Sequence, residues 1–311
     1  MKKTIAILLC ISVLLLACAC GEEKQTAPEA EGVTVTDVYG SSAVLTADSR
    51  VAFAQTSFAQ CWVLAGGEPA GVTLDAVEDR GMRFTGEVEI IGTVKSVDLE
   101  KLVALEPDYV VLSADLTAHT ELKDSLEQMG IACGYFQVDT FEDYKAMMSQ
   151  FCAVTGRDDL YEQNVSQVEE TIERVRAAIP AENGDSVLLL RAYSTGVKAK
   201  TDDNLAGQIL KEFHLENIAD KTPSLLEELS IEQIIKEDPR YIFVLTMGDE
   251  QAAMDYMRQN VENDPAWGSL TAVKEGRYLF LPQDLFHYKP NERWGESYEY
   301  LAEIIYPEIF G

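Results

Sequence analysis

The chain has 311 residues, 47% of them hydrophobic, and its 53 acidic and 25 basic side chains give a formal net charge of −28 at pH 7. A surface of this charge repels phosphate backbones and anionic lipid headgroups, which argues against a nucleic-acid partner and against a protein that lies flat on a membrane. The length allows two packed cores, because single cores stop growing at roughly 250–300 residues.

The first residues have the pattern of an export signal. Lys2 and Lys3 precede an apolar run over residues 5–16, which is far shorter than the roughly 20 residues that span a bilayer. The run leads into Leu-Leu-Ala-Cys at residues 15–18. This is the pattern of a bacterial lipobox, in which a large aliphatic residue and a small residue precede the cysteine that receives a diacylglycerol.

We therefore expect residues 1–17 to be a lipoprotein signal peptide and Cys18 to be lipidated, with Cys20 as the alternative. A plain secretory signal with incidental cysteines is the competing interpretation. Residues 18–32 are rich in Glu, Ala and Pro and have no apolar period, so we expect a flexible tether.

The next part of the chain alternates short β-branched runs with helical patterns. This alternation is typical of a parallel sheet with crossover helices and predicts an N-terminal α/β lobe over residues 33–156. A hairpin is expected at residues 33–37 and 42–45, strands at 50–54, 88–91, 109–112 and 132–136, and helices at 57–65, 98–104, 116–129 and 140–155.

A single amphipathic helix is expected to follow the first lobe, within a connecting segment at residues 157–181. Between residues 158 and 179 the apolar positions recur in steps of four and three, which predicts about 22 helical residues and a length of roughly 33 Å. They are Tyr161, Val165, Val168, Ile172, Val175 and Ile179. A stiff helix of this kind between two lobes limits hinge motion.

The second half repeats the plan of the first and predicts a C-terminal α/β lobe over residues 182–311. Residues 91–112 and 222–245 are alike, because each has a short helix with a glutamate, Glu100 or Glu232, then a proline turn and a buried strand. The expected fold class is α/β, with two Rossmann-like lobes that have central parallel sheets, one long connecting helix and a ligand cleft between the lobes. Strands are expected at residues 186–190, 241–245 and 278–281, and helices at 207–214, 231–236, 249–260 and 294–306.

Ile91-Gly92-Thr93, the stretches at residues 98–102 and 107–111, and the C-terminal helix at 294–307 carry a resemblance to a known family. On these residues the chain resembles the bacterial ABC-importer binding proteins for iron-siderophores, haem and vitamin B12, over nearly all of residues 33–311. The resemblance implies a monomeric lipoprotein without enzymatic activity or intrinsic cofactor, on the extracytoplasmic face of the bacterial cell membrane. It also implies that an iron-chelate, haem or corrinoid is captured there and delivered to an ABC permease dimer with its ATPase subunits.

The same resemblance implies that Glu100 and Glu232 dock into arginine pockets on the two permease subunits. The alternative is that each is an ordinary solvated carboxylate in the first turn of a helix, where the helix dipole favours it.

Ligands of such folds bind against the loops at the carboxyl ends of the parallel strands. Polar and aromatic side chains at these places are the expected ligand contacts. In the first lobe they are Gln55, Thr56, Ser57, Phe58, Ser113 with the two residues after it, and Phe136. In the second lobe they are Arg191, Tyr193, Thr246, Met247, Phe286, His287, Tyr288, Lys289 and Trp294.

Several of these residues have two interpretations. His287 could ligate haem iron, or it could only stack and hydrogen-bond. Met247 is a soft ligand or, more simply, a packing residue. Arg191 suits an anionic ligand or a structural ion pair, and Trp294 belongs to the core or lines the cleft.

Two other functions compete with this interpretation. A binding protein for bare zinc or manganese needs several histidines and carboxylates at one site, whereas the three histidines, His119, His214 and His287, are scattered. An exported hydrolase would be expected to show a Gly-x-Ser-x-Gly or His-Glu-x-x-His motif, and neither occurs. The cysteines of the folded part, Cys61, Cys133 and Cys152, are expected to be buried thiols, or one disulfide with one thiol left over.

Overall fold

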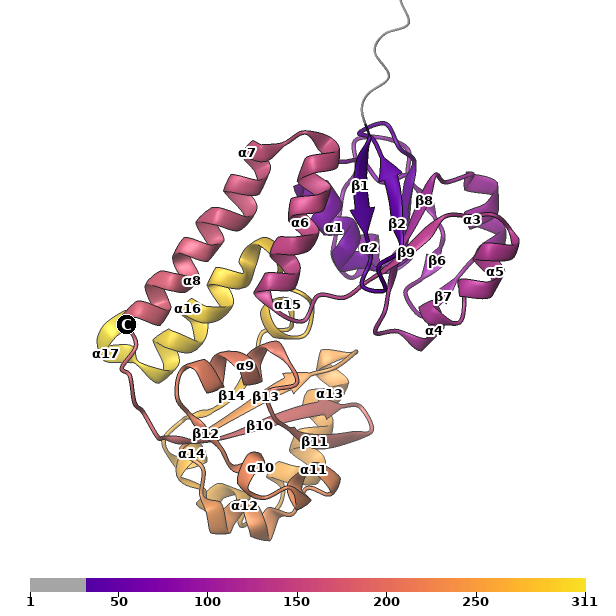
Figure 1. Ribbon diagram of the computed structural model, residues 1–311. Coiled ribbons are helices and arrows are strands. Elements are labelled where there is room, and N and C mark those ends of the chain that lie inside the picture. Colours follow the sequence, from indigo (N-terminus) through magenta and orange to yellow (C-terminus); the bar gives the residue numbers. More distant parts are fainter. Residues whose placement is uncertain (1–31) are drawn as a thin grey trace, which may run out of the picture. The chain divides into compact units, whose positions relative to one another are not determined.

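The computed structural model describes residues 32–311. The predicted signal peptide, the lipidation sites Cys18 and Cys20, and all of the predicted tether except residue 32 lie outside these residues. Two α/β lobes flank a long helix (Figure 1). Within the described part of the chain, no helix combines the length and the apolar character that a bilayer span requires.

The N-terminal lobe contains a five-stranded sheet in the order β5-β4-β3-β8-β9, and all four pairings are parallel. Two small antiparallel hairpins, β1-β2 and β6-β7, lie outside this sheet. The strands are β1 (Val33–Thr36), β2 (Ser42–Leu45), β3 (Val51–Phe53), β4 (Gly71–Val72), β5 (Glu89–Ile90), β6 (Gly92–Thr93), β7 (Ser96–Val97), β8 (Tyr109–Ser113) and β9 (Cys133–Phe136). The helices are α1 (Thr56–Leu64), α2 (Leu74–Glu78), α3 (Leu99–Leu105), α4 (Thr117–Thr120), α5 (Lys123–Gln128) and α6 (Phe141–Thr155).

The connecting helix is continuous from α7 (Asp158–Tyr161) through a π-helical turn (Glu162–Ser166) to α8 (Gln167–Ala178). It ends where Ile179 becomes extended before Pro180. Val165, Val168, Ile172 and Val175 of the apolar stripe are buried. The prediction of one long amphipathic helix between the lobes is therefore confirmed.

The C-terminal lobe contains a second five-stranded sheet in the order β11-β10-β13-β14, and β12 also pairs with β10. The β10-β13, β13-β14 and β10-β12 pairings are parallel, but β11 is antiparallel to β10, so this sheet is mixed and not purely parallel as predicted. The strands are β10 (Ser186–Tyr193), β11 (Gly196–Lys200), β12 (Glu216–Asn217), β13 (Tyr241–Thr246) and β14 (Tyr278–Leu281).

Nine α-helices of this lobe follow from residue 205 onward within the described chain. They are α9 (Leu205–Glu212), α10 (Ile218–Lys221), α11 (Ser224–Glu227), α12 (Ile231–Glu237), α13 (Glu250–Met257), α14 (Thr271–Lys274), α15 (Gln283–Phe286), α16 (Trp294–Ile305) and α17 (Pro307–Phe310). In Figure 1, α16 runs alongside α8. Gly295 permits this approach, because a Cβ at that position would lie 2.9 Å from Cγ2 of Thr171.

The central strands β3, β8 and β13 are buried on both faces, as their near-continuous apolar sequences require. Tyr109 and Val111 of β8 face a core that also contains Ile172 of the connecting helix, whereas Val110 and Leu112 face a separate core in the N-terminal lobe. The strands β10 and β13 alternate in the same way between the shared core and a third core in the C-terminal lobe. The connecting helix is thus packed into the hydrophobic core that the two lobes share.

Several features of the fold differ from the sequence-based expectation. The predicted helix at residues 116–129 is two short helices, α4 and α5, and the break falls beside His119, whose buried ring bonds to backbone groups of two other segments. The strands β4, β6 and β7 and the helix α2 have only two to five residues, which is too short to give a periodic pattern. β11 was not predicted. The strand β10 continues to Tyr193, so Arg191 lies within a strand and not after one. Cys61, Cys133 and Cys152 are free thiols.

Candidate ligand-binding cleft

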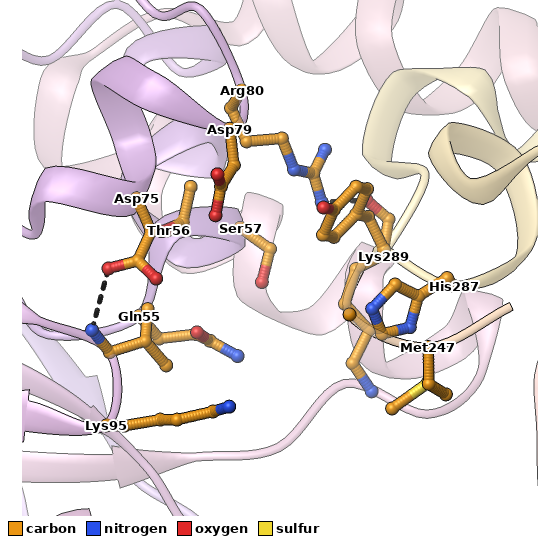
Figure 2. A pocket seen from close by; sticks show the side chains of 13 residues that line it. Gln55, Thr56, Ser57, Asp75, Asp79, Arg80, Lys95, Met247, His287 and Lys289 are labelled. Carbon is orange, nitrogen blue, oxygen red and sulfur yellow. Dashed lines mark hydrogen bonds between the residues drawn. The ribbon is translucent and has the colours of Figure 1, made fainter. Parts of the chain in front are cut away.

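The carboxyl ends of β3, β8, β9 and β13 face two adjoining cavities of about 320 and 400 Å³, which the two lobes enclose together. Volumes of this size are typical of small-molecule sites. Figure 2 shows the first cavity, with Gln55, Ser57 and Lys95 on one wall and Met247 and His287 on the other.

The beginning of α1 forms one part of the N-terminal wall. Gln55 is the N-cap residue, but its side chain does not cap the helix. The hydroxyl groups of Thr56 and Thr73 are 3.1 Å apart and satisfy each other. Ser57 is only 4% exposed, and its hydroxyl has no hydrogen-bond partner among residues 32–311. The first turn of α1 therefore presents unused donors to the cavity.

The turn between β6 and β7 forms a second part of this wall and carries Lys95. Val94 in this turn is held from both sides, because its N–H donates to Oδ2 of Asp75 (2.9 Å) and its carbonyl accepts from Nε2 of His119 (2.9 Å). Nδ1 of His119 in turn accepts from the N–H of Ser113 (3.0 Å). Burial lowers the pKa of His119, so the ring is neutral and carries its proton on Nε2.

Arg80 lines the cleft but was not predicted from the sequence. It donates to Oε1 of Gln60 and to the carbonyl of Lys289, each at 2.9 Å, and its guanidinium lies 4.7 Å from the centre of the Tyr288 ring. Its Nε is buried and has no partner among the described residues. Residues 79–88 have no helical or strand period, so no pattern in the sequence indicated that this segment reaches the cleft.

The C-terminal wall is formed by the loops after β13 and α15 and by β10. Gln283 donates to the hydroxyl of Thr246 (3.0 Å) and to the carbonyl of Gly248 (3.2 Å), which fixes the backbone on both sides of Met247. The ring of His287 lies 4.7 Å from that of Tyr288. Burial, with the positive charges of Arg191 and Arg80, lowers the pKa of His287 to about 4. The imidazole is therefore neutral near pH 7 and has a free nitrogen lone pair.

The segment at residues 289–292 joins the C-terminal wall to the N-terminal lobe. Nζ of Lys289 bonds to Oδ1 of Asp139 (2.8 Å), and Nδ2 of Asn291 donates to the carbonyl of Ser57 (3.1 Å). Burial alone would raise the pKa of Asp139, but the hydrogen bond and charge of Lys289 hold it below its usual range. Gln60 also donates to the carboxylate of Glu292 (3.2 Å).

The structure brings together most of the residues predicted as ligand contacts. Those that line the two cavities are Gln55, Thr56, Ser57, Ser113, Asp115, Arg191, Met247, Phe286, His287, Tyr288, Lys289 and Trp294. Phe58 and Phe136 do not line them, because both side chains point into the shared hydrophobic core. Tyr193, at the end of β10, is half-buried and also lies outside them.

Other residues line the cavities and were not predicted: Asp75, Asp79, Arg80, Val94, Lys95, Leu116, Asp139, Asp203, Asn204, Leu205, Gly248 and Pro290. Most come from short elements or loops, for which the sequence has no periodic signal. Within residues 32–311 there is no group of three or more His, Cys, Asp or Glu side chains that could hold a metal ion.

Glu100 and Glu232 lie outside the cavities, at equivalent positions on the two lobes. Both are exposed second residues of seven-residue helices, α3 and α12. The N-cap side chains, Asp98 and Ser230, accept from backbone N–H groups of the first turn. Each helix then ends in a left-handed residue before a proline and a buried strand.

Comparison with known proteins gives the same architecture. The model of the family described as "Periplasmic binding protein" matches residues 52–285. The Fe(3+)-citrate-binding protein YfmC of Bacillus subtilis is 23% identical over 296 residues, which cover 91% of this chain and 90% of YfmC. Among solved structures, the petrobactin-binding protein YclQ of Bacillus subtilis superposes with a TM-score of 0.67 at 18% identity, over 90% of this chain and 99% of YclQ.

IsdE of S. aureus, solved in complex with heme, superposes with a TM-score of 0.65 at 14% identity, over 83% of this chain and 99% of IsdE. These similarities confirm the predicted fold class of two α/β lobes with one connecting helix. Because the family model matches most of the chain, the protein belongs to the periplasmic binding protein family.

Proposed function

We propose that this protein is the substrate-binding component of an ABC importer and that it carries an oxygen-rich ferric chelate to the permease. It works outside the membrane, anchored through Cys18 or alternatively Cys20, and it catalyses no reaction. The relatives support this class of ligand, since one binds Fe(3+)-citrate and another is a petrobactin-binding protein.

The choice of ligand rests on a set of side-chain hydrogen-bond donors around the cleft that have no partner. Seven buried side-chain polar atoms of residues 32–311 lack a hydrogen-bond partner, and four of these belong to residues that line the two cavities. They are Oγ of Ser57, Nε of Arg80, Nε of Arg191 and Nε1 of Trp294. All four can donate, and leaving such a group unpaired costs about 1–3 kcal/mol. A ligand with many acceptor oxygens, such as a ferric carboxylate or catecholate chelate, would satisfy them.

Haem is a second ligand that one observation favours. The neutral imidazole of His287 at the cleft has the protonation state that an axial iron ligand needs. Met247 lies on the same wall as His287 (Figure 2), so it is poorly placed to bind the opposite face of the iron. A haem complex through His287 would lose or shift its Soret band when His287 is changed to Ala.

Fluorescence titration tests the ligand class, because Trp294 lines the cavity while Trp62 and Trp267 are buried elsewhere. We expect ferric citrate or a ferric siderophore to quench the emission at micromolar concentrations or below. The quenching should largely vanish in Trp294→Phe and persist in the matched control Trp267→Phe. The ferric-chelate proposal fails if neither ferric citrate nor any ferric siderophore binds, and the wider class of ligand fails if haem and cyanocobalamin do not bind either.

The equivalent positions of Glu100 and Glu232 support their proposed role in docking. The two lobes repeat the same short helix with the same capping, and each presents one exposed carboxylate in its first turn. Such carboxylates can accept bidentate hydrogen bonds from arginines of a permease.

Changing both residues to Lys should abolish ligand-dependent stimulation of the importer's ATPase while ligand affinity stays normal. Glu308→Lys is the matched control, since Glu308 is also an exposed carboxylate in a first helical turn. Normal stimulation by the double variant would rule out the docking role.

A further inference from the structure

The helix α1 begins at the cleft without a side-chain cap. It has nine residues, Gln55 at its N-cap provides no capping hydrogen bond, and no acidic residue occurs in its first turn. Thr56 and Ser57 are its first two residues, so their N–H groups have no carbonyl one turn earlier to bond. Six other helices of the described residues have a side-chain cap, from Asp98, Thr140, Asn204, Asn217, Ser230 or Asp249, whereas helices such as α2, α4 and α16 have none. The positive end of the α1 dipole is thus left open to the cavity.

The side chain of Ser57 provides a second and independent observation. It is 96% buried, its hydroxyl has no partner in the described part of the chain, and Ser57 lines the cavity. Figure 2 shows this side chain directed into the pocket. The neighbouring Thr56 does not share this property, since its hydroxyl is already paired with that of Thr73.

We propose that the N-terminus of α1 is a carboxylate-binding subsite, in which a free carboxylate of the carried chelate accepts from the first-turn N–H groups and from the hydroxyl of Ser57. This inference rests on the proposed ligand-binding function and narrows it to chelates that keep such a carboxylate. Helix N-termini bind anions in this way.

The charged side chains around the subsite balance in number. Arg80 and Lys95 line the same cavity and attract an anion, but Asp75 and Asp79 line it as well. Attraction and repulsion both grow in proportion to the charge of the ligand, so the directional part of anion binding here comes from the first-turn N–H groups and the hydroxyl of Ser57. Asp75 is held by the N–H of Val94, so it cannot turn away without breaking that bond.

A carboxylate built into the protein at this position provides a sharp test. Gln55→Asp places an N-cap carboxylate on the same N–H groups and so competes with the ligand from within. We expect the ligand-free variant to melt a few degrees higher, because Asp is a good N-cap, while its affinity for ferric citrate falls at least tenfold. Ser57→Ala should weaken ferric citrate binding several-fold without loss of stability, since the hydroxyl it removes is unpaired.

Ferrioxamine, a hydroxamate chelate without a free carboxylate, is the control ligand. Selective loss of ferric citrate binding in both variants, with any ferrioxamine binding unchanged, supports the subsite. Three outcomes would overturn the subsite and leave the proposed function standing. They are equal losses of binding for both chelates, unchanged ferric citrate binding in the variants, and a wild-type protein that binds only carboxylate-free ligands. If the wild-type protein binds no chelate, haem or corrinoid at all, the proposed function itself fails.

Discussion

His287 shows how one residue at the cleft couples ligand chemistry to stability. Its pKa in the folded protein is lowered to about 4 by burial and by the charges of Arg191 and Arg80, whereas an unfolded histidine titrates near 6.5. Below pH 6.5 the unfolded chain therefore binds the proton more readily than the folded chain. The stability that the neutral ring contributes is present above pH 6.5 and is lost as the pH falls from 6.5 toward 4.

His287→Gln should remove this part of the pH dependence. Between pH 7 and pH 5 we expect the free energy of unfolding of the wild-type protein to fall by about 2 kcal/mol more than that of the variant. Urea unfolding at both pH values measures the difference, and His119 is present in both proteins and cancels. Parallel losses in the two proteins would show that His287 is not held neutral.

The residues of the cleft divide into those that the sequence could indicate and those that it could not. Ser57, Met247 and His287 come within six residues of the end of an apolar strand, and the carboxyl ends of parallel strands meet at one edge of the sheet. Arg80 follows the five-residue helix α2 and meets Tyr288 only because two segments far apart in the chain pack together. Phe58 and Phe136 have the expected chain positions, but their side chains turn into the core.

Among the elements, the turn between β6 and β7 is held by the hydrogen bonds of the His119 ring, which join three segments of the chain. We call these hydrogen bonds the clamp. His119 of α4 holds the carbonyl of Val94 and the N–H of Ser113, so the turn that carries Lys95 is fixed to the end of β8. His119 does not contact the cavities. We infer that it acts on ligand binding only through the position of this turn.

A double-mutant cycle separates this positioning role from a general loss of structure. His119→Asn keeps an acceptor for Ser113 but loses the donor to Val94, and we expect a loss of about 1–3 kcal/mol of stability, because the carbonyl is left unpaired, together with weaker binding of the ferric chelate. If Lys95 is the side chain that the clamp positions, Lys95→Ala in the His119→Asn background should cost no further affinity. Additive losses in binding would contradict the positioning role.

The elements also differ in how well their own residues predict them. The helices predicted at residues 98–104 and 140–155 are confirmed, and each begins beside a residue, Asp98 or Thr140, whose side chain caps it by accepting from nearby backbone N–H groups. Strands such as β4 and the pair β6-β7 have two residues each and owe their existence to neighbouring strands. The antiparallel β11 was not predicted, since the direction of a strand in a sheet is set by its partner and not by its own residues.

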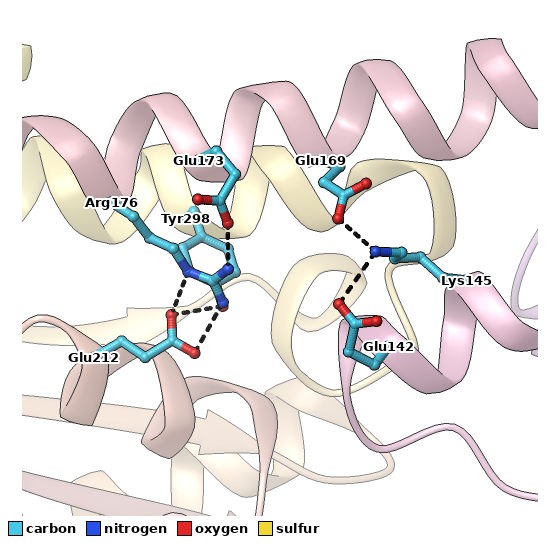
Figure 3. A network of polar contacts seen from close by, with 7 residues as sticks. All are labelled: Glu142, Lys145, Glu169, Glu173, Arg176, Glu212 and Tyr298. Atoms are coloured by element: carbon cyan, nitrogen blue, oxygen red, sulfur yellow. Dashed lines mark hydrogen bonds and ion pairs between the residues drawn. The ribbon is translucent and has the colours of Figure 1, made fainter.

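At the scale of the whole molecule, two different connections tie the lobes together. The first is the connecting helix with its polar contacts (Figure 3). Lys145 of α6 pairs with Glu169 of the helix, and Arg176 of the helix bonds to Glu212 of α9 at 2.9 and 3.0 Å. Tyr298 of α16 donates to the same carboxylate (3.0 Å). The helix is therefore fixed to elements of both lobes by polar contacts as well as by its apolar stripe.

The second connection is the segment at residues 289–292, which belongs to the C-terminal half of the chain but is anchored on the N-terminal lobe. Asn291 is 1% exposed, adopts a left-handed φ of 53°, donates to the carbonyl of Ser57 and accepts from the thiol of Cys61 (3.5 Å). Lys289 was predicted as a ligand contact, but no pattern in the sequence indicated the anchor at Asn291. Because the anchor lies beside the cleft, we infer that it limits how far the lobes can separate.

Asn291→Gly tests this inference, since glycine tolerates the left-handed backbone and the substitution removes the side chain that makes both hydrogen bonds. Spin labels at Lys123→Cys in α5 and Lys236→Cys in α12, in a background without the half-buried Cys133, report the distance between the lobes. We expect the distance distribution of the ligand-free protein to broaden toward longer values in Asn291→Gly. Glu212→Gln is the control: it should cost about 1 kcal/mol, because the pair is partly exposed, and leave the distribution unchanged, since Val168, Ile172 and Val175 still hold the helix. A distribution that stays narrow in Asn291→Gly would leave the connecting helix as the element that restricts lobe motion.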